Sequence, residues 1–381
     1  MSNHRKKQPP FCPLEQHYSK TASFLSIIPQ NKLNFSFEYY NQILNKTGYI
    51  DSFKGKWSSL IGRKESSLFK NLVKSALRES IVSSYRMEGV MITQEEIKEF
   101  PASNSIYKML TQQQQEIISF VEVSNEYLSN YSKVELSQKY LKQLYKDLFK
   151  NENLDTPLYS EYKKKPNRVV AYSPNGTHKD ILNTTEPYLV EKEIHEILTW
   201  TMRQMNSNLM HPLIIIGLFT YELILIQPFQ YANCRFSYIL TRLLLLKSGY
   251  TFINYLSFEN IIERNKLDFF DALKGGQINR YSYEERINKW LLFFLTSIQT
   301  AIIKLENSIE NPVDEISYIN ERQKKLKNNI RKYQPVKLAD VARRMQDVSI
   351  NTMKKDLQQL KAMGIISSSG KNRGTVYSVV E

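Results

Sequence analysis

The stretch between residues 226 and 235 brings together side chains that could bind a phosphate group. It reads Ile-Gln-Pro-Phe-Gln-Tyr-Ala-Asn-Cys-Arg and lies between two apolar runs with helical character. Asn233 and the backbone N–H groups around it would form an anion-binding concavity, with Arg235 in the first helical turn as a charge-assisted phosphate ligand. The alternative is structural: Asn233 caps the following helix and Arg235 forms a salt bridge.

The same stretch resembles the signature of the Fic family, His-Pro-Phe-x-(Asp/Glu)-Gly-Asn-Gly-Arg-x-x-Arg. Four residues match that pattern: Pro228, Phe229, Asn233 and Arg235. The order of parts around the loop also resembles the family core, with His211-Pro212-Leu213 opening one helix before the loop and a second helix ending before Gly249. The resemblance covers roughly residues 70–309. It implies that Ala232, Asn233, Cys234 and Arg235 bind ATP or another nucleotide.

Gln227 stands where the family has its catalytic histidine. In active members that histidine takes a proton from a target hydroxyl, which then attacks the α-phosphate of ATP and becomes modified with AMP. A neutral glutamine amide cannot accept this proton. Loss of a general base lowers a rate by about 10²–10⁴-fold. We therefore expect the position to be inactive.

Other positions of the signature also depart from the family pattern. Tyr231 replaces the acidic residue expected to hold Mg²⁺, a hard cation that prefers carboxylate oxygen, which argues against Mg²⁺ as a cofactor. Ala232 and Cys234 replace two glycines, so a positive φ at either position would be strained. Tyr238 replaces the second arginine, which removes a cation from the phosphate clamp.

A second resemblance lies at residues 83–89. Ser84, Glu88 and Gly89 fit the family's (Ser/Thr)-x-x-x-Glu-(Gly/Asn) inhibitory motif at the end of a helix. In relatives this glutamate pairs with the second arginine and obstructs the γ-phosphate. Since that arginine is Tyr238 here, Glu88 has two possible partners, the Tyr238 hydroxyl and Arg235.

The elements that must position these residues are mainly helical. Apolar residues recur at helical spacing in the following ranges: 66–87, 136–149, 191–205, 212–226, 235–248, 265–273 and 283–309. Residues 168–172 are β-prone and lie within a loop rich in Pro, Lys, Asn, Gly and Thr. In the family the corresponding strand is a flap that pairs with a target protein, whereas the residues alone are equally compatible with an ordinary surface hairpin.

The C-terminal residues predict a separate basic module. From Tyr318 to Glu381 there are 14 Lys and Arg against 5 Asp and Glu, a balance of +9 out of +14 for the chain. Two short helices, 338–345 and 349–363, precede a hairpin, and this order resembles a winged helix. The second helix carries Lys354, Lys355 and Lys361, and the hairpin tip carries Lys371 and Arg373. We expect these five residues to contact duplex DNA, although winged helices also serve as protein-interaction or dimer modules.

We therefore predict a mainly α fold: a Fic-type helical core with a small β-hairpin flap, plus a C-terminal winged-helix domain. The expected domains are an N-terminal helical region (1–125), the Fic-like core (126–310), and a linker helix with the winged helix (311–381). A homodimer is compatible with this architecture.

Composition excludes several other classes. Two cysteines cannot form a disulfide framework, and five scattered histidines show no spacing for a metal site. No apolar run is long enough to cross a membrane, and the first residues are polar, so we expect no membrane partner and a cytoplasmic protein.

Two functions remain open. One is a nucleotide- or peptide-binding regulator with a degenerate Fic site and a DNA-binding module. The other is a protein adenylyltransferase that transfers AMP from ATP to a protein hydroxyl without the histidine.

Overall fold

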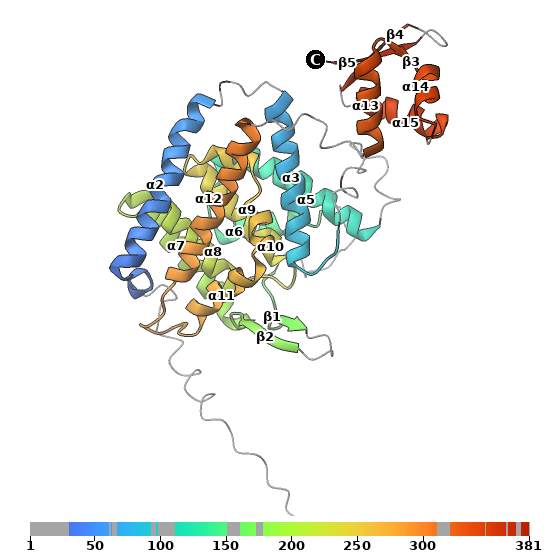
Figure 1. Cartoon of the computed structure of the whole chain (residues 1–381). Helices are drawn as coiled ribbons and strands as arrows, with labels where there is room; N and C mark the ends of the chain where they lie inside the picture. Colours follow the sequence, from blue (N-terminus) through green and yellow to red (C-terminus); the bar gives the residue numbers. More distant parts are fainter. Residues whose placement is uncertain are drawn as a thin grey trace, which may run out of the picture. The chain divides into compact units, whose positions relative to one another are not determined.

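The computed structural model describes residues 30–60, 62, 67–92, 97, 111–150, 161–172, 178–310, 321–346, 348–362, 365–370 and 375–380. It divides into two compact units, Met1–Glu306 and Asn307–Glu381, which are described separately (Figure 1).

The first unit is built from α-helices. In chain order they are α2 (Phe37–Leu60), α3 (Ser67–Met87), α5 (Gln112–Ser129), α6 (Gln138–Asp147), α7 (Val190–Ser207), α8 (Pro212–Ile226), α9 (Asn233–Lys247), α10 (Phe258–Arg264), α11 (Lys266–Gln277) and α12 (Asn288–Glu310). Short 3-10 helices are η1 (Gln30–Leu33), η4 (Tyr131–Lys133), η6 (Pro187–Leu189) and η7 (Thr251–Tyr255). The predicted mainly α fold is confirmed. The expected helix at 265–273 is preceded by a separate one, α10, and α2 and α5 had no predicted counterpart.

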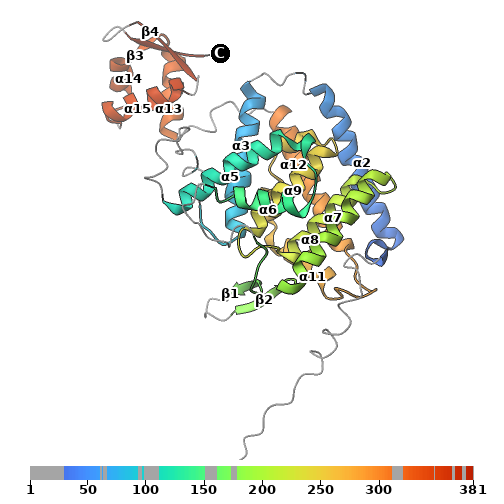
Figure 2. The same ribbon diagram turned by 180° about the vertical axis from the view of Figure 1, so that it is seen from behind.

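Helices α8 and α9 form the centre of this unit (Figures 1 and 2). Because α8 is apolar on all sides, it is stable only when other elements surround it completely. Nearly all of its residues are buried. Gly217 lets α12 approach closely: a Cβ there would lie 2.6 Å from Cδ1 of Leu291. The Trp290 indole of α12 donates to the Gly217 carbonyl at 2.7 Å. This packing fixes where α8 ends and the loop begins.

Strands β1 (Arg168–Tyr172) and β2 (His178–Asn183) form an antiparallel hairpin that projects from the helices (Figure 1). The register pairs Arg168 with Asn183 and contains an irregularity between Val169 and Val170. The Gln277 side chain of α11 accepts from the Asn183 backbone N–H at 3.0 Å, which attaches the hairpin base to the helical body.

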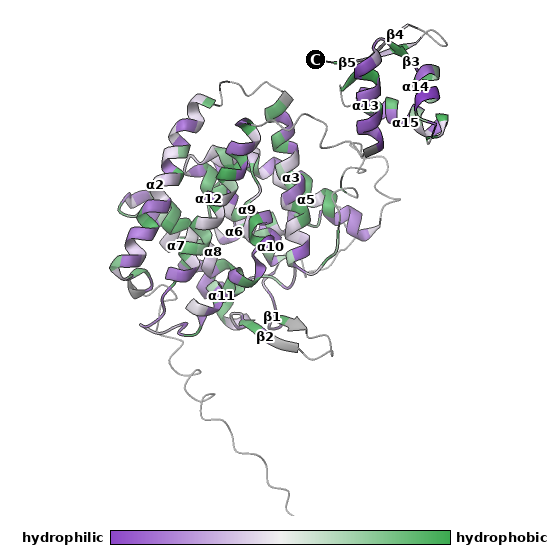
Figure 3. Cartoon of the chain, viewed as in Figure 1, coloured by the Kyte–Doolittle hydropathy of each residue, from purple (hydrophilic) through white to green (hydrophobic). Residues whose placement is uncertain are grey.

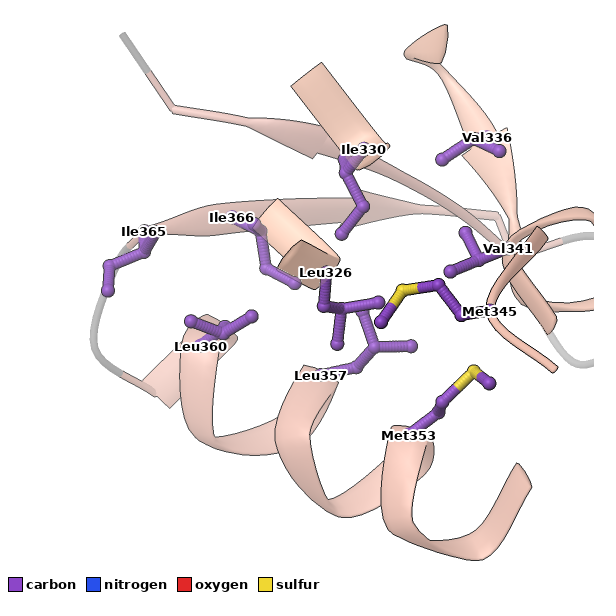
Figure 4. Packing of buried hydrophobic residues seen from close by; sticks show 10 residues of the cluster. All are labelled: Leu326, Ile330, Val336, Val341, Met345, Met353, Leu357, Leu360, Ile365 and Ile366. Carbon is purple, nitrogen blue, oxygen red and sulfur yellow. The ribbon is translucent and has the colours of Figure 1, made fainter. Parts of the chain in front are cut away.

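The second unit contains α13 (Glu321–Tyr333), β3 (Val336–Lys337), α14 (Leu338–Arg344), α15 (Ile350–Ala362), β4 (Ile366–Ser369) and β5 (Val376–Val379). Its three strands are ordered β3-β5-β4 and are antiparallel. The visible face of α13 is largely hydrophilic (Figure 3). Helices and sheet enclose one apolar cluster, formed by Leu326, Ile330, Val336, Val341, Met345, Met353, Leu357, Leu360, Ile365 and Ile366 (Figure 4).

Candidate functional site

The loop between α8 and α9 begins and ends with residues in left-handed backbone conformations. Gln227 has φ 44° and is the C-cap of α8, and Ala232 has φ 54° and is the N-cap of α9. Ala232 therefore adopts the strained conformation that a glycine would take freely, at a cost of about 1–2 kcal/mol. Gln227 is half-buried, and the Tyr231 side chain is 59% exposed.

Asn233 holds the loop together from within. Its Oδ1 accepts from the Phe229 N–H at 3.0 Å, and its Nδ2 donates to the Phe229 carbonyl at 2.7 Å. Asn167, just before the hairpin, donates to the same carbonyl at 2.8 Å. The Tyr145 ring of α6 stacks on Phe229 with centroids 3.6 Å apart. The asparagine predicted to bind nucleotide thus uses its amide for internal contacts.

Lys163 attaches the segment before the hairpin to the same loop. Its backbone N–H donates to the Pro228 carbonyl at 2.9 Å. Its Nζ donates to the Ile226 carbonyl at 2.9 Å and to the Thr184 hydroxyl at 3.0 Å. The residue is 4% exposed, and burial lowers the pKa of its amine to about 8. Sequence reasoning missed Lys163 because it opens a run of three lysines that gives no signal for a buried position.

The N-terminus of α9 is occupied by a carboxylate of the protein itself. Oε1 of Glu88 accepts from the backbone N–H groups of Cys234 at 3.1 Å and Arg235 at 3.3 Å. Its Oε2 accepts from Nε of Arg235 at 2.8 Å. A helix N-terminus and a guanidinium together make an anion site, and Glu88 fills it.

Arg235 is enclosed by further residues from α3 and α5. Glu116 lies 3.6 Å from its Nη1, and the Tyr85 ring centroid lies 4.2 Å from its guanidinium carbon. Only 7% of Arg235 is exposed. Burial raises the pKa of Glu116, and the Arg235 charge opposes that effect. Glu88 is therefore the nearer of two carboxylates that balance this buried cation.

The remaining residues of the two motifs make contacts within the fold. Ser84 donates to the Ser80 carbonyl one turn earlier, at 2.6 Å. Gly89 ends the helical run with φ 85°. Tyr238 is buried, and its ring packs edge-on against Phe258. Of the two partners that the sequence left open for Glu88, the structure has Arg235.

One cysteine, Cys234, lies at the start of α9, and its thiol is held in its protonated form. Burial, followed by the neighbouring Glu88 charge, raises the pKa of the Cys234 thiol to about 12, so the sulfur stays protonated. Across the residues that the structure describes, no group of three or more His, Cys, Asp or Glu side chains could hold a metal ion. Tyr231 brings a phenol to the loop, whereas Mg²⁺ prefers carboxylate oxygen.

In the second unit, α15 presents one polar face to solvent. Asn351, Lys354, Lys355, Gln358 and Lys361 are exposed along it. Asp356 on the opposite side is buried and pairs with Arg322 of α13 at 2.6 Å, which fixes the rotation of the helix. Ser349 caps its start by accepting from the Thr352 N–H at 3.2 Å. The other two predicted DNA contacts, Lys371 and Arg373, lie outside the described residues.

The chain is similar to solved structures of Fic proteins. It matches a Fic family protein from Desulfovibrio desulfuricans G20 with TM-score 0.54 and 15% identity, over 89% of this chain and 96% of that one. It matches a Fic domain containing signaling protein from Bacteroides thetaiotaomicron with TM-score 0.50 and 16% identity, over 68% and 93%. A third match is Fic-1 (residues 134–508) from C. elegans, with TM-score 0.50 and 12% identity, over 72% and 73%.

Neither a protein-family model nor a curated protein matches the sequence. The structural matches show that the chain has a Fic fold, which confirms the fold that the resemblance implied. Among the described residues, no helix is long and apolar enough to span a membrane.

Proposed function

We propose that this chain is a regulator built on a Fic fold that has lost efficient AMP transfer and contacts duplex DNA through its second unit. The observation that carries the proposal is the Glu88 carboxylate on the N–H groups of Cys234 and Arg235. Any phosphate that binds at the start of α9 must displace this carboxylate. The loop then recognises a nucleotide only when α3 releases Glu88.

Residue chemistry supports the loss of transfer. Gln227 offers no base for an attacking hydroxyl, and Tyr231 offers no carboxylate for a metal ion. The deficit from the missing base alone is about 10²–10⁴-fold. Arg235 remains able to pair with a phosphate, so binding can persist where catalysis does not.

Incubation of the full chain with labelled ATP and candidate proteins tests this part. We expect no label transfer above background for the wild type. Transfer that requires Mg²⁺ and decreases in an Arg235→Ala variant would instead establish the adenylyltransferase function. A companion thermal-shift series with ATP, ADP and inorganic phosphate should give a larger stabilisation for Glu88→Gln than for the wild type, because a ligand that binds only the folded state raises its apparent stability.

A protein target is a second element of the proposal. In the described residues β1 and β2 form a sheet of two strands, so each strand has an edge without a neighbouring strand. An extended segment of a target can add to such an edge through backbone hydrogen bonds. Lys163 and Asn167 connect this hairpin region to the α8–α9 loop, so target binding and loop geometry are mechanically linked.

For DNA, the support comes from the second unit's element order and charge. Helix, strand, two helices and a hairpin follow one another as in a winged helix, with α15 as the recognition helix. Fluorescence anisotropy of a labelled duplex should report binding that weakens steeply with salt, because phosphate contacts release counterions. Equal binding after removal of Tyr333–Glu381, or none at low salt, would refute the assignment.

A further inference from the structure

The second unit contains a groove of about 1060 Å³ between α14, α15 and the sheet. We call it the α14–α15 groove. Its buried and half-buried lining residues include Leu338, Ala342, Leu357 and Tyr377, and its exposed ones include Lys337, Lys354 and Lys361. The groove therefore has an apolar base and a cationic edge.

The charge of the lining has one sign. Every charged residue that lines the groove in the described part of the chain is a lysine. None of these three lysines forms an ion pair with another described residue. The acidic residue of α15, Asp356, is engaged with Arg322 and Gln323 and does not line the groove. The groove thus favours an anionic occupant.

The apolar base limits which anion fits. A protein surface that binds DNA is polar and strongly cationic. A duplex whose phosphates contacted the lysines would leave the apolar base of the groove without a partner. Ala339 is exposed at this groove, and Ile350, 55% exposed, extends its apolar surface. A peptide helix with one apolar face and acidic flanks would cover the base and pair with the edge at the same time.

We propose that the α14–α15 groove binds an acidic amphipathic segment of a partner protein. Its apolar side chains pack on Leu338, Leu357 and Tyr377, and its carboxylates pair with the edge lysines. Lys354 and Lys361 belong both to this groove and to the DNA-contacting face of α15, whereas Lys355 belongs only to the latter. Segment and duplex therefore compete for the second unit, which gives the partner control over DNA binding.

The probe is a fluorescein-labelled synthetic helix with leucines at i, i+3, i+4 and i+7 spacing and glutamates elsewhere. Its control is a permuted peptide with the same composition and no apolar face. Titration of the full chain should give at least about tenfold tighter binding of the amphipathic peptide, because only that peptide places its leucines on the base of the groove. Equal affinities would mean that charge alone drives binding, and would overturn the proposal.

Matched variants locate the contact. Ala339→Trp fills the groove without changing charge, and Asn328→Trp places the same side chain at an exposed position of α13 outside the groove. We expect Ala339→Trp to weaken the peptide about tenfold or more, and Asn328→Trp to leave it within about twofold. Wild-type affinity in Ala339→Trp would refute the groove as the site. Circular dichroism on both variants checks that the fold is retained.

Duplex binding, measured beside peptide binding, tests the groove and the DNA assignment separately. Lys355→Gln should weaken the duplex and leave the peptide within about twofold of wild type, since Lys355 is outside the groove. Peptide binding without any duplex binding would refute the DNA assignment and support the groove. Simultaneous binding of saturating peptide and duplex would overturn the proposed competition.

Discussion

Arg235 at the start of α9 and the lysines of α15 are both candidates for binding anions, yet their surroundings differ. Arg235 is buried, touches Glu88 at 2.8 Å and has Glu116 at 3.6 Å. Lys354, Lys355 and Lys361 are exposed on one face of α15, and Asp356 of the same helix points to the opposite side. The first cation is balanced inside the fold, while the others face solvent.

This difference bears on how each site can be used. At α9 an external anion has to replace the Glu88 carboxylate, so its binding competes with a contact inside the protein. At α15 an anion only has to displace water and counterions, so its binding depends mainly on salt concentration. Both features support the proposal that the protein binds anions and does not transfer AMP.

The largest expected effect follows from Glu88→Ala. Arg235 would keep only the more distant Glu116, and breaking a buried ion pair from one side typically costs about 3–5 kcal/mol. We expect the free energy of unfolding in urea to decrease by about 3 kcal/mol, with part of the decrease recovered by added phosphate. Glu79→Ala, in α3, breaks a partly exposed pair with Lys304 and should cost less than about 1 kcal/mol. Equal decreases in the two variants would contradict an internally filled anion site.

The second prediction concerns the open face. Replacing Lys354, Lys355 and Lys361 by glutamine should reduce the slope of log K against log salt by about 0.9 for each phosphate that the protein no longer neutralises, or roughly 2.7 in total. The measurement is duplex binding by anisotropy at several salt concentrations. The control replaces Lys70, Lys74 and Lys139, which are exposed on helices of the first unit. A slope that decreases equally in the control would show that overall charge, and not the α15 face, governs binding.

A smaller effect should appear when the free energy of unfolding of Lys163→Met is compared with that of the wild type at several pH values. The pKa of Lys163 is about 8 in the fold and near 10.5 ordinarily, so between these values the unfolded chain holds more protons at this residue. Stability from this group then increases with pH by up to about 1.4 kcal/mol per unit. Relative to Lys163→Met, the wild type should gain about 1–2 kcal/mol from pH 8 to pH 10. Lys165→Met, at an exposed neighbour, should show no such trend. If the difference in unfolding free energy between the wild type and Lys163→Met does not change with pH, the lowered pKa of Lys163 is refuted.

The smallest effect is expected for Ala232→Gly. Relief of the left-handed conformation gains about 1–2 kcal/mol, and the greater freedom of glycine in the unfolded chain offsets about 0.5–1 kcal/mol. Urea denaturation should show a net gain of about 0.5 kcal/mol. Ala76→Gly, in the interior of α3, should instead lower stability by about 1 kcal/mol. A decrease at position 232 comparable to that at position 76 would show that the loop stores no backbone strain.

Much of the fold could be predicted because its signals are local. Pro212 and the apolar run after it define α8, and Pro228 interrupts helical structure before α9. Strand β1 has the predicted bounds for a similar reason, since β-prone residues stand alone in a polar loop. Helices α2 and α5 were missed because their apolar residues are interrupted by polar ones and bury only a narrow face. The absence of a base at position 227 also needs no structure, because an amide does not accept a proton in any fold.

The partners of each site residue were decided only by the tertiary structure. Glu88 and Arg235 are separated by 147 positions, and the sequence left the Tyr238 hydroxyl as the other possible partner of the glutamate. Packing of α3 beside α9 brings the carboxylate to Arg235 and encloses Tyr238 against Phe258. The buried position of Lys163 could not be predicted for the same reason, because it depends on contacts with Ile226 and Thr184 that form only in the folded chain. Residue types set which reactions are possible, and long-range packing set which anion the loop holds.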